Sequence, residues 1–162
     1  MKRHLGRRLA LVGLAVTTAV TGVLPGAMTA QADTVAELVQ VVDPSLWSPI
    51  APGPAGVAYR PDENSLIVVD SDRNNLSGFD GINLWEYSLT TGLVLYTGVL
   101  PTIEPTGVDY DPDNNRLFVS SDSDDLVLVI GPGADGKFGT GDDVDLGQVA
   151  LVGDIEDPVF HP

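Results

Sequence analysis

The residues most able to do chemistry are aspartates gathered in three short polar segments. They are Asp70 and Asp72 in the first segment, Asp122 and Asp124 in the second, and Asp135, Asp142 and Asp143 in the third. Calcium takes six to eight oxygen ligands at flexible distances, and loops rich in Asp, Asn and Ser supply such oxygens. The segments are therefore calcium candidates. Solvated hairpin turns of the same composition are the alternative, and both interpretations stay open.

The spacing of the first segment can be compared with that of an EF-hand calcium loop. Asp70, Asp72 and Asn74 match positions 1, 3 and 5 of that loop, but position 6 is Asn75 instead of glycine and position 12 is Gly81 instead of glutamate. An EF-hand is therefore excluded. An extracellular calcium site with a dissociation constant near ~10⁻⁴ M would add only about 1.4 kcal/mol in millimolar calcium, so calcium would tune stability.

Catalytic machinery of other kinds has little material in this chain. There is no cysteine, and His161 is the only histidine after residue 32. Asp109 and Asp111 flank Tyr110 and would share one face of a strand. Acid–base catalysis also needs one carboxyl held protonated by burial, which spacing does not show. We predict no catalytic residue and no cofactor other than calcium.

The N-terminal segment has the composition of an export signal. Four basic residues precede an apolar run from Leu9 to Leu24, and small residues form a cleavage sequence that ends at Ala32. We predict a helical signal peptide over residues 1–32 that is removed on secretion to the cell exterior. Arg7 and Arg8 loosely match a twin-arginine pattern, but paired arginines are common in such regions, so we favour Sec export.

The charge balance excludes several classes of partner. After residue 32 the chain keeps four basic residues against 23 acidic ones, a formal net charge of −19. Binding to nucleic acids or anionic lipids requires clustered cations, so we expect neither nucleic acid nor membrane contact once the signal is removed. A protein or small-molecule ligand of unknown identity remains as the partner.

A gapless internal repeat organises the rest of the sequence. Residues 54–68 align with residues 105–119 at a shift of 51 residues, with 9 of 15 pairs identical. Residues 155–158 echo residues 103–105, so a third unit begins just before the sequence stops. A chain that is a fragment of a longer propeller is therefore one interpretation.

Each unit contains the signals for four short strands. In the first unit they are the Gly-Val-x-Tyr strand after Pro54, then residues 66–69, 83–88 and 93–99. A Pro-Asp-x-Asn turn joins the first two strands. Four strands in about 50 residues make one propeller blade. We predict an all-β fold, a partial β-propeller of two four-stranded antiparallel blades with equivalent strands 51 residues apart.

This organisation divides the chain into five parts. They are the signal peptide at 1–32, a strand or linker at 33–53, blade 1 at 54–104, blade 2 at 105–154 and the start of a third blade at 155–162. Because a closed ring needs about four to eight blades, we expect open edges that invite self-association. We also expect Val57, Ile67 and Trp85 to be less buried than in a closed ring.

The motif Pro-x-Gly-Val-x-Tyr-x-Pro, followed by Asn-x-Leu-[Ile/Phe]-Val, resembles NHL-type repeats and the blades of secreted phytase-like propellers. The resemblance implies the blade architecture and leaves the function open, because propellers host binding modules and enzymes alike. Our first hypothesis is a secreted, non-catalytic binding or scaffold module. The alternative is part of a calcium-dependent, phytase-like or esterase-like hydrolase, which four scattered basic residues do not favour.

Overall fold

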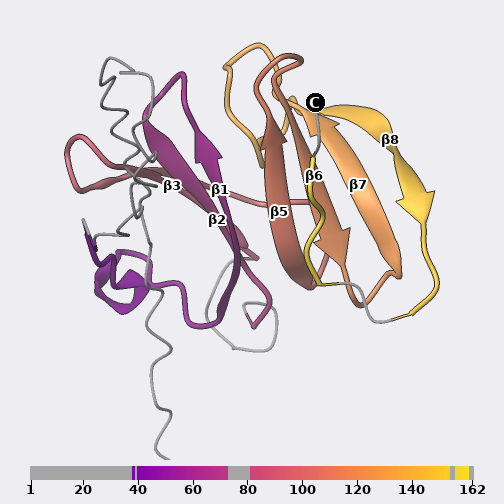
Figure 1. Ribbon diagram of the computed structural model, residues 1–162, viewed down its shortest axis with the longest axis horizontal. Coiled ribbons are helices and arrows are strands. Elements are labelled where there is room, and N and C mark those ends of the chain that lie inside the picture. Colours follow the sequence, from indigo (N-terminus) through magenta and orange to yellow (C-terminus); the bar gives the residue numbers. More distant parts are fainter. Residues whose placement is uncertain (1–37, 39, 73–80, 154–155, 161–162) are drawn as a thin grey trace, which may run out of the picture. The chain divides into compact units, whose positions relative to one another are not determined.

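The computed structural model describes residues 38, 40–72, 81–153 and 156–160 (Figure 1). The predicted signal peptide and its helix lie outside the described residues, as do His161 and the first residue of the predicted third blade. Residues 38 and 40–43 are irregular and belong to a separate compact unit, whereas the sheets belong to the unit that continues from Pro44. Within the described ranges, no helix has the length and apolar composition needed to cross a bilayer.

The described chain is all-β, as predicted, apart from one short 3-10 helix, η1 (Pro44–Leu46). Two four-stranded antiparallel sheets follow in chain order, each with its strands side by side in the order of the sequence. Sheet 1 contains β1 (Pro54–Arg60), β2 (Ser65–Asp70), β3 (Leu84–Ser88) and β4 (Val94–Gly98). Sheet 2 contains β5 (Pro105–Asp111), β6 (Arg116–Ser121), β7 (Leu126–Gly131) and β8 (Val144–Ala150). This arrangement is that of two consecutive propeller blades.

The first hairpin turn has the same structure in both sheets. Asn64 and Asn115 each adopt a left-handed conformation with φ of 47°. The hydroxyl of Tyr59 donates to Asn64 Oδ1 at 3.2 Å, and the hydroxyl of Tyr110 donates to Asn115 Oδ1 at 3.0 Å. Asparagine tolerates left-handed geometry better than most residues do. The repeated Pro-Asp-x-Asn motif therefore specifies one turn twice.

The spacing of equivalent strands departs from the predicted 51 residues in the second half of each blade. β1 and β5 begin 51 residues apart, as do β2 and β6, but β3 and β7 begin 42 apart and β4 and β8 begin 50 apart. The reason is that the two blades carry long connections at different places. The β2–β3 connection far exceeds the four-residue β6–β7 turn, whereas the β7–β8 connection exceeds its β3–β4 counterpart.

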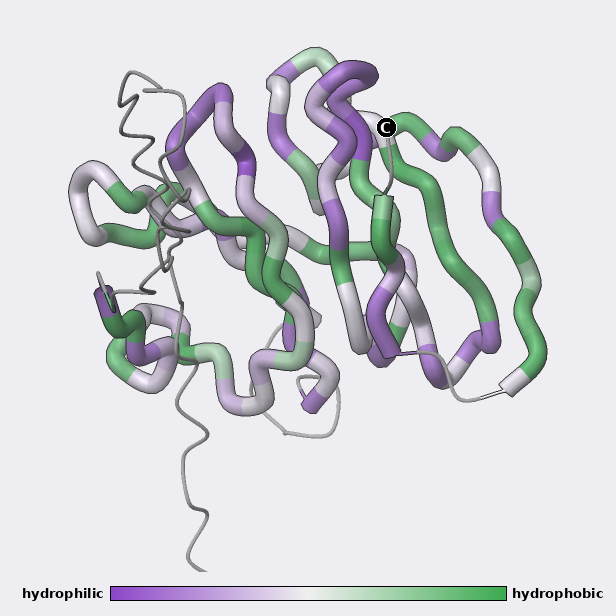
Figure 2. Tube along the Cα trace, in the orientation of Figure 1, coloured by the Kyte–Doolittle hydropathy of each residue, from purple (hydrophilic) through white to green (hydrophobic). Residues whose placement is uncertain are grey.

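The two blades pack head to tail through one hydrophobic core. Ala58 and Val108 both belong to the core cluster, yet they occupy non-equivalent positions, because Ala58 aligns with Asp109 and Val108 aligns with Val57. One face of the repeat thus packs against the opposite face of the next copy. Such a contact between two different faces is heterologous, as in a repeating array. The hydrophobic stretches of β2 and β7 mark this core in Figure 2.

The outer face of blade 1 is covered, contrary to our expectation for Trp85 and Ile67, whose side chains are both fully buried. Trp47 lies 6.4 Å from Trp85 and stacks on Tyr87 at 5.4 Å between ring centroids. Ile67 faces the interblade core instead. Of the three residues expected to be less buried, only Val57 is half-buried. The segment before β1 therefore closes a face that the repeat alone would leave open.

Close backbone contact between successive first strands depends on glycine. A Cβ added at Gly56 would lie 2.7 Å from Gly107 Cα and 2.8 Å from Val108 N, both in the backbone of β5. Backbone atoms cannot turn aside as the end of a side chain can, so the blades would have to separate. We predict that Gly56→Ala lowers the free energy of unfolding by roughly 1–3 kcal/mol, measured by urea denaturation.

Gly141→Ala is the matched control, because a Cβ there meets nothing within 4 Å and the backbone does not have a positive φ. We expect this change to leave stability unaltered or to raise it by about 0.4–1 kcal/mol. Equal urea midpoints for the two variants would refute the close packing of β1 on β5.

Candidate functional site

The connection between β7 and β8, residues 132–143, packs against blade 1 and is named here the interblade loop. Its Phe138 is fully buried and meets the Tyr110 ring edge-on at 6.2 Å between centroids. The backbone N–H of Phe138 donates to Tyr96 Oη at 3.0 Å, and the N–H of Val99 donates to Gly139 O at 2.7 Å. Phe138 was not among the residues predicted from the sequence, although an isolated aromatic residue in a Gly- and Asp-rich segment was an available signal.

The carboxylates of the interblade loop shape the loop itself. Asp142 Oδ1 accepts from the Thr140 hydroxyl at 2.7 Å, and Asp142 Oδ2 accepts from the backbone N–H of Asp135 at 3.3 Å. Asp143 accepts from two backbone N–H groups, at 2.7 and 3.2 Å. The hydrogen bond from Thr140 is the main reason that the pKa of Asp142 is lowered. Burial raises the pKa of Asp143 despite its backbone hydrogen bonds.

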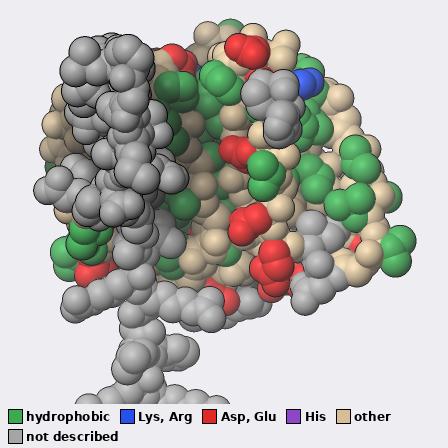
Figure 3. Space-filling view, in the orientation of Figure 1, with side chains coloured by type: hydrophobic (Ala, Val, Ile, Leu, Met, Phe, Trp, Pro, Cys, Tyr) green, Lys and Arg blue, Asp and Glu red, His purple; other side chains and the backbone are tan. Residues whose placement is uncertain are grey.

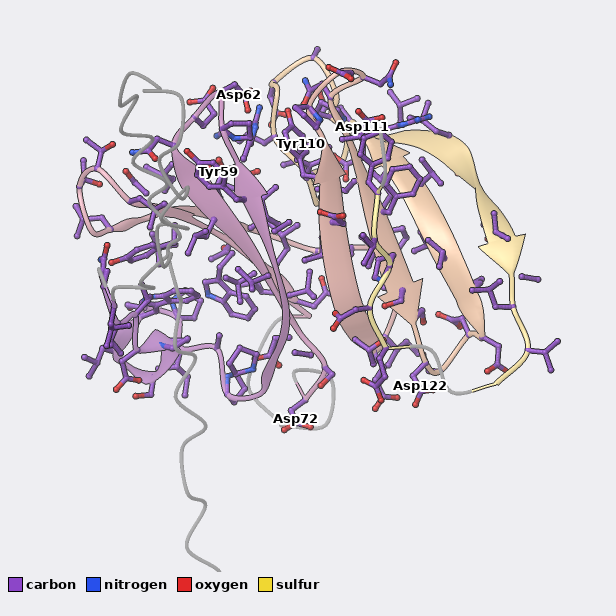
Figure 4. The ribbon with its side chains drawn as sticks, viewed as in Figure 1. Tyr59, Asp62, Asp72, Tyr110, Asp111 and Asp122 are labelled. Carbon is purple, nitrogen blue, oxygen red and sulfur yellow. The ribbon has the colours of Figure 1, made fainter. Side chains whose placement is uncertain are left out.

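The other two acidic segments lie at the far end of the sheets from the β1–β2 and β5–β6 turns. Figure 4 shows Asp72 and Asp122 at one end, and Asp62 and Asp111 at the other. Asp70 is fully buried and accepts from the backbone N–H groups of Gly53 at 2.7 Å and Asp72 at 3.0 Å. This carboxylate ties the chain before β1 to the end of β2.

In the second segment, Asp122 is half-buried and Asp124 is largely exposed. Asp124 Oδ2 accepts from the hydroxyls of Ser121 at 2.7 Å and Thr102 at 3.0 Å, which ties the turn to the linker between the blades. Among the described residues, no three Asp, Glu or His side chains lie close enough together to hold a metal ion. Calcium binding at the seven aspartates stays a prediction.

The paired carboxylates of β5 have structural partners. Asp111 is fully buried and accepts from Arg116 Nε at 2.8 Å and from the Asn114 side chain at 2.8 Å. Burial alone would raise the pKa of Asp111, but the hydrogen bonds from Asn114 and Arg116 outweigh it, and the pKa is lowered. A general acid would need the opposite shift. Asp109 Oδ2 accepts from the backbone N–H of Phe160 at 2.6 Å.

A buried ion pair lies beside the interblade loop. Arg60 Nη1 is 3.4 Å from Glu86 Oε2, and both side chains are almost completely buried. The Ser65 hydroxyl donates to Glu86 Oε1 at 2.5 Å, while Arg60 Nη1 also donates to the carbonyl of Gly136 at 3.4 Å. The guanidinium lies 5.6 Å from the centroid of the Phe138 ring. Burial alone would lower the pKa of Arg60, but Glu86 outweighs it and the pKa is raised.

An open cleft of about 550 Å³, named here the interblade cleft, lies between the interblade loop, the linker after β4, and strands β7 and β8. Its lining consists of Val99, Leu100, Pro101, Leu128 and Ile130, with Thr140, Asp143, Asp145 and Gln148. The apolar floor is part of the core, because Leu100, Leu128 and Ile130 are at most 9% exposed. The polar members come from the loop and β8. The volume and the mixture of an apolar floor with a few polar groups are typical of small-molecule sites.

Strand register places the polar groups of β8 in the cleft. Asp145 pairs with Ile130 and Gln148 pairs with Leu128, and partner residues of antiparallel strands share one face of the sheet. A register shift between these pairs keeps both polar side chains on the core-facing side. The hydrophobic side chains of β8 point the other way and are exposed, as Figure 3 shows at the edge occupied by this strand.

The cleft can bind a small molecule, but its described lining lacks the side chains of a familiar catalytic centre. Its described lining offers two carboxylates, one amide and one hydroxyl, with no cysteine, histidine or basic side chain. Asp143 has a raised pKa, but its two oxygens already accept backbone hydrogen bonds that orient the loop. The chemistry available is therefore hydrogen bonding and charge attraction over an apolar surface.

Comparisons with known proteins show partial likenesses to solved structures, and two of these follow. No protein-family model matches the chain, and no curated protein is significantly similar to it. A hydrazine synthase of Kuenenia stuttgartiensis is 15% identical with a TM-score of 0.47, over 66% of this chain and 26% of its own. A protein from Lactobacillus plantarum is 18% identical with a TM-score of 0.45, over 68% of this chain and 29% of its own. This chain thus spans less than a third of either solved chain.

Proposed function

We propose that this chain is a secreted, propeller-type binding module without catalysis, and that its ligand occupies the interblade cleft. The cleft itself carries the proposal. It combines an apolar floor of buried side chains with polar groups that reach solvent, and it has the volume of a small-molecule site. The Pro-x-Gly-Val-x-Tyr motif at the start of β1 and β5 supports the finer assignment to NHL-type or phytase-like blades.

Two further parts of the proposal concern the surface. The apolar side chains of β8, Val144, Leu146 and Val149, are about half exposed on an edge strand, which supports self-association through this edge. Calcium at the acidic turns would add only about 1.4 kcal/mol of stability in millimolar calcium, for a dissociation constant of ~10⁻⁴ M. The hydrolase alternative has less support, because a phosphate would need basic side chains and none of the described residues that line the cleft is basic.

A neutral fluorescent probe tests the cleft. We predict that Nile red binds the mature chain saturably at one site with blue-shifted emission, because the apolar floor excludes water from the dye. Val99 lines the cleft and is 51% exposed, so Val99→Trp fills the cleft without disturbing the core. We expect Val99→Trp to weaken binding by roughly tenfold or more, about 1.4 kcal/mol.

Val152→Trp is the matched control, since Val152 is fully exposed and lies outside both the cleft lining and strand β8. It adds the same indole to the surface and should change the affinity by no more than about twofold. Unaltered Nile red binding by Val99→Trp, or no saturable binding by the parent chain, would remove the basis for the proposed function.

A further inference from the structure

The interblade cleft carries charge of one sign beside its apolar floor. Asp143 and Asp145 supply carboxylates, Thr140 and Gln148 supply neutral polar groups, and no basic side chain is among its described lining residues. Asp145 and Gln148 are exposed, so their polar ends are accessible to a ligand, whereas Asp143 is half-buried. A ligand that covers the floor would bring its polar end against these carboxylates.

The two carboxylates differ in the number of acceptor sites left for a ligand. Asp143 already accepts from the N–H groups of Gly139 and Thr140 and from the Thr140 hydroxyl, which leaves about one of its four acceptor sites. Asp145 Oδ1 accepts from the backbone N–H of Gly147 at 2.8 Å, a contact that also fixes the direction of the side chain. An ionised carboxylate offers about four acceptor sites, so one backbone bond leaves room for a charged donor. Hydrogen bonds from a cation to a carboxylate are roughly twice as strong as neutral ones.

The charge of the whole chain favours the same kind of ligand. After residue 32 the formal net charge is −19, and the four basic residues of that part of the chain are scattered along it. Acidic side chains are dispersed over the face shown in Figure 3. Such a field attracts cations and repels anions, and it acts most strongly in a cleft with low-dielectric walls. An anionic amphiphile would fit the floor but would place its head beside two carboxylates.

We propose that the interblade cleft binds amphipathic amines, with the ammonium head held by Asp143 and Asp145 and the apolar body lying over Leu128 and Ile130. This inference rests on the proposed function, because it assigns a ligand class to the same cleft. The register of β8 explains the geometry. The pairing of Asp145 with Ile130 sets a carboxylate and an apolar side chain next to each other on one face, so a single ligand can reach both.

The test uses three eight-carbon probes that differ in their head group, each competing with Nile red on the mature chain. n-Octylamine is protonated at neutral pH, 1-octanol is neutral and octanoate is anionic. We expect octylamine to displace the dye at a concentration roughly tenfold lower than octanol does, with octanoate the weakest of the three. The apolar tails of octylamine and octanol are identical, so the ranking of these two probes reports the head group alone.

Two isosteric variants locate the effect. Asp145→Asn should weaken octylamine by about five- to tenfold and leave octanol within about twofold. Asp125→Asn is the control, because this exposed aspartate in the β6–β7 turn lies outside the cleft lining, and it should alter neither probe. Thermal melts of both variants check that the fold is intact.

The outcomes separate this inference from the proposed function. Displacement by octylamine and octanol at equal concentrations, or an Asp145→Asn variant that keeps the full preference, overturns the amine assignment while the cleft remains a binding site. Absence of saturable Nile red binding in the parent chain overturns both.

Discussion

Replacing Arg60 with methionine should lower the free energy of unfolding by about 3–5 kcal/mol, because the carboxylate of Glu86 would then be buried without a cation. Glu86 is 1% exposed and Arg60 is 6% exposed, so solvent cannot take the place of the lost partner. Methionine keeps most of the apolar stem that packs beside Phe138. The change would be read from urea denaturation followed by tryptophan fluorescence, which Trp85 reports from inside blade 1.

Two further variants test whether the loss of stability comes from the unpaired carboxylate of Glu86. Adding Glu86→Gln to Arg60→Met should recover at least about half of the loss, because a neutral amide still accepts the hydrogen bond from Ser65. Lys137→Met removes an exposed cation that lies 5.3 Å from the Tyr96 ring centroid, and it should cost less than about 1 kcal/mol. An Arg60→Met variant no less stable than Lys137→Met would show that the Arg60–Glu86 ion pair of blade 1 is not buried in solution.

The large expected cost does not mean that the ion pair is the best stabiliser of this interface. Taking two charges out of water is expensive, and hydrophobic replacements of similar volume often serve equally well. Arg60 Nε is buried without a hydrogen-bond partner, although Asp62 Oδ2 lies 3.4 Å away. The main contribution of the ion pair is to position the interblade loop. By donating to Gly136 O while pairing with Glu86, Arg60 fixes the interblade loop against blade 1.

Repetition made the first half of each blade predictable. A gapless match over residues 54–68 and 105–119 implies one local structure formed twice, and the paired asparagine turns confirm it. β3 and β7 could not be placed by the same shift, because a connection can lengthen at little thermodynamic cost and its length is not constrained by the core. The all-β class followed from local strand and turn signals, which do not depend on the length of the connections.

The cleft could not be predicted, because it arises from contacts between segments distant in the sequence. The pattern of polar and apolar residues in β8 does not by itself indicate a cleft. Only the register of β8 with β7 shows that Asp145 lies beside Ile130. A shift by one residue would have sent this carboxylate to the solvent face. Trp47 is a similar case, because nothing near it in the sequence indicates that it covers Trp85 and Tyr87.

The acidic segments show how composition can indicate a chemistry and still leave the structural role unstated. Loops rich in aspartate suit calcium, but in this fold Asp70 and Asp124 accept hydrogen bonds that join each blade to its linkers. Both uses rest on the same property, a short side chain with several acceptor sites. Sequence alone does not separate them, because the deciding factor is which donors the rest of the chain brings within reach.

Replacing Phe138 with alanine should cost about 3–5 kcal/mol of stability, because the ring is fully buried in the interblade core and the cavity left behind would be bounded by both blades. This is a large part of the roughly 5–15 kcal/mol that stabilises an ordinary domain. Phe138→Leu keeps most of the apolar volume and should cost less than half as much. Leu146→Ala, at a position 51% exposed, should stay within about 0.5 kcal/mol of the parent.

Phe138→Ala should also weaken ligand binding, because the buried ring of Phe138 holds the loop that forms one wall of the cleft. Phe138 anchors the loop that carries Thr140 and Asp143, two of the polar groups in the cleft. Without the ring, the loop would lose its main apolar contact with blade 1, and its amide groups should exchange with solvent faster than those of β6. Nile red affinity should then fall for Phe138→Ala by more than for Leu146→Ala under conditions in which both variants remain folded. If Phe138→Ala matched Leu146→Ala in both stability and dye affinity, the interblade loop would not be packed as described, and the cleft would lose the wall on which its proposed function depends.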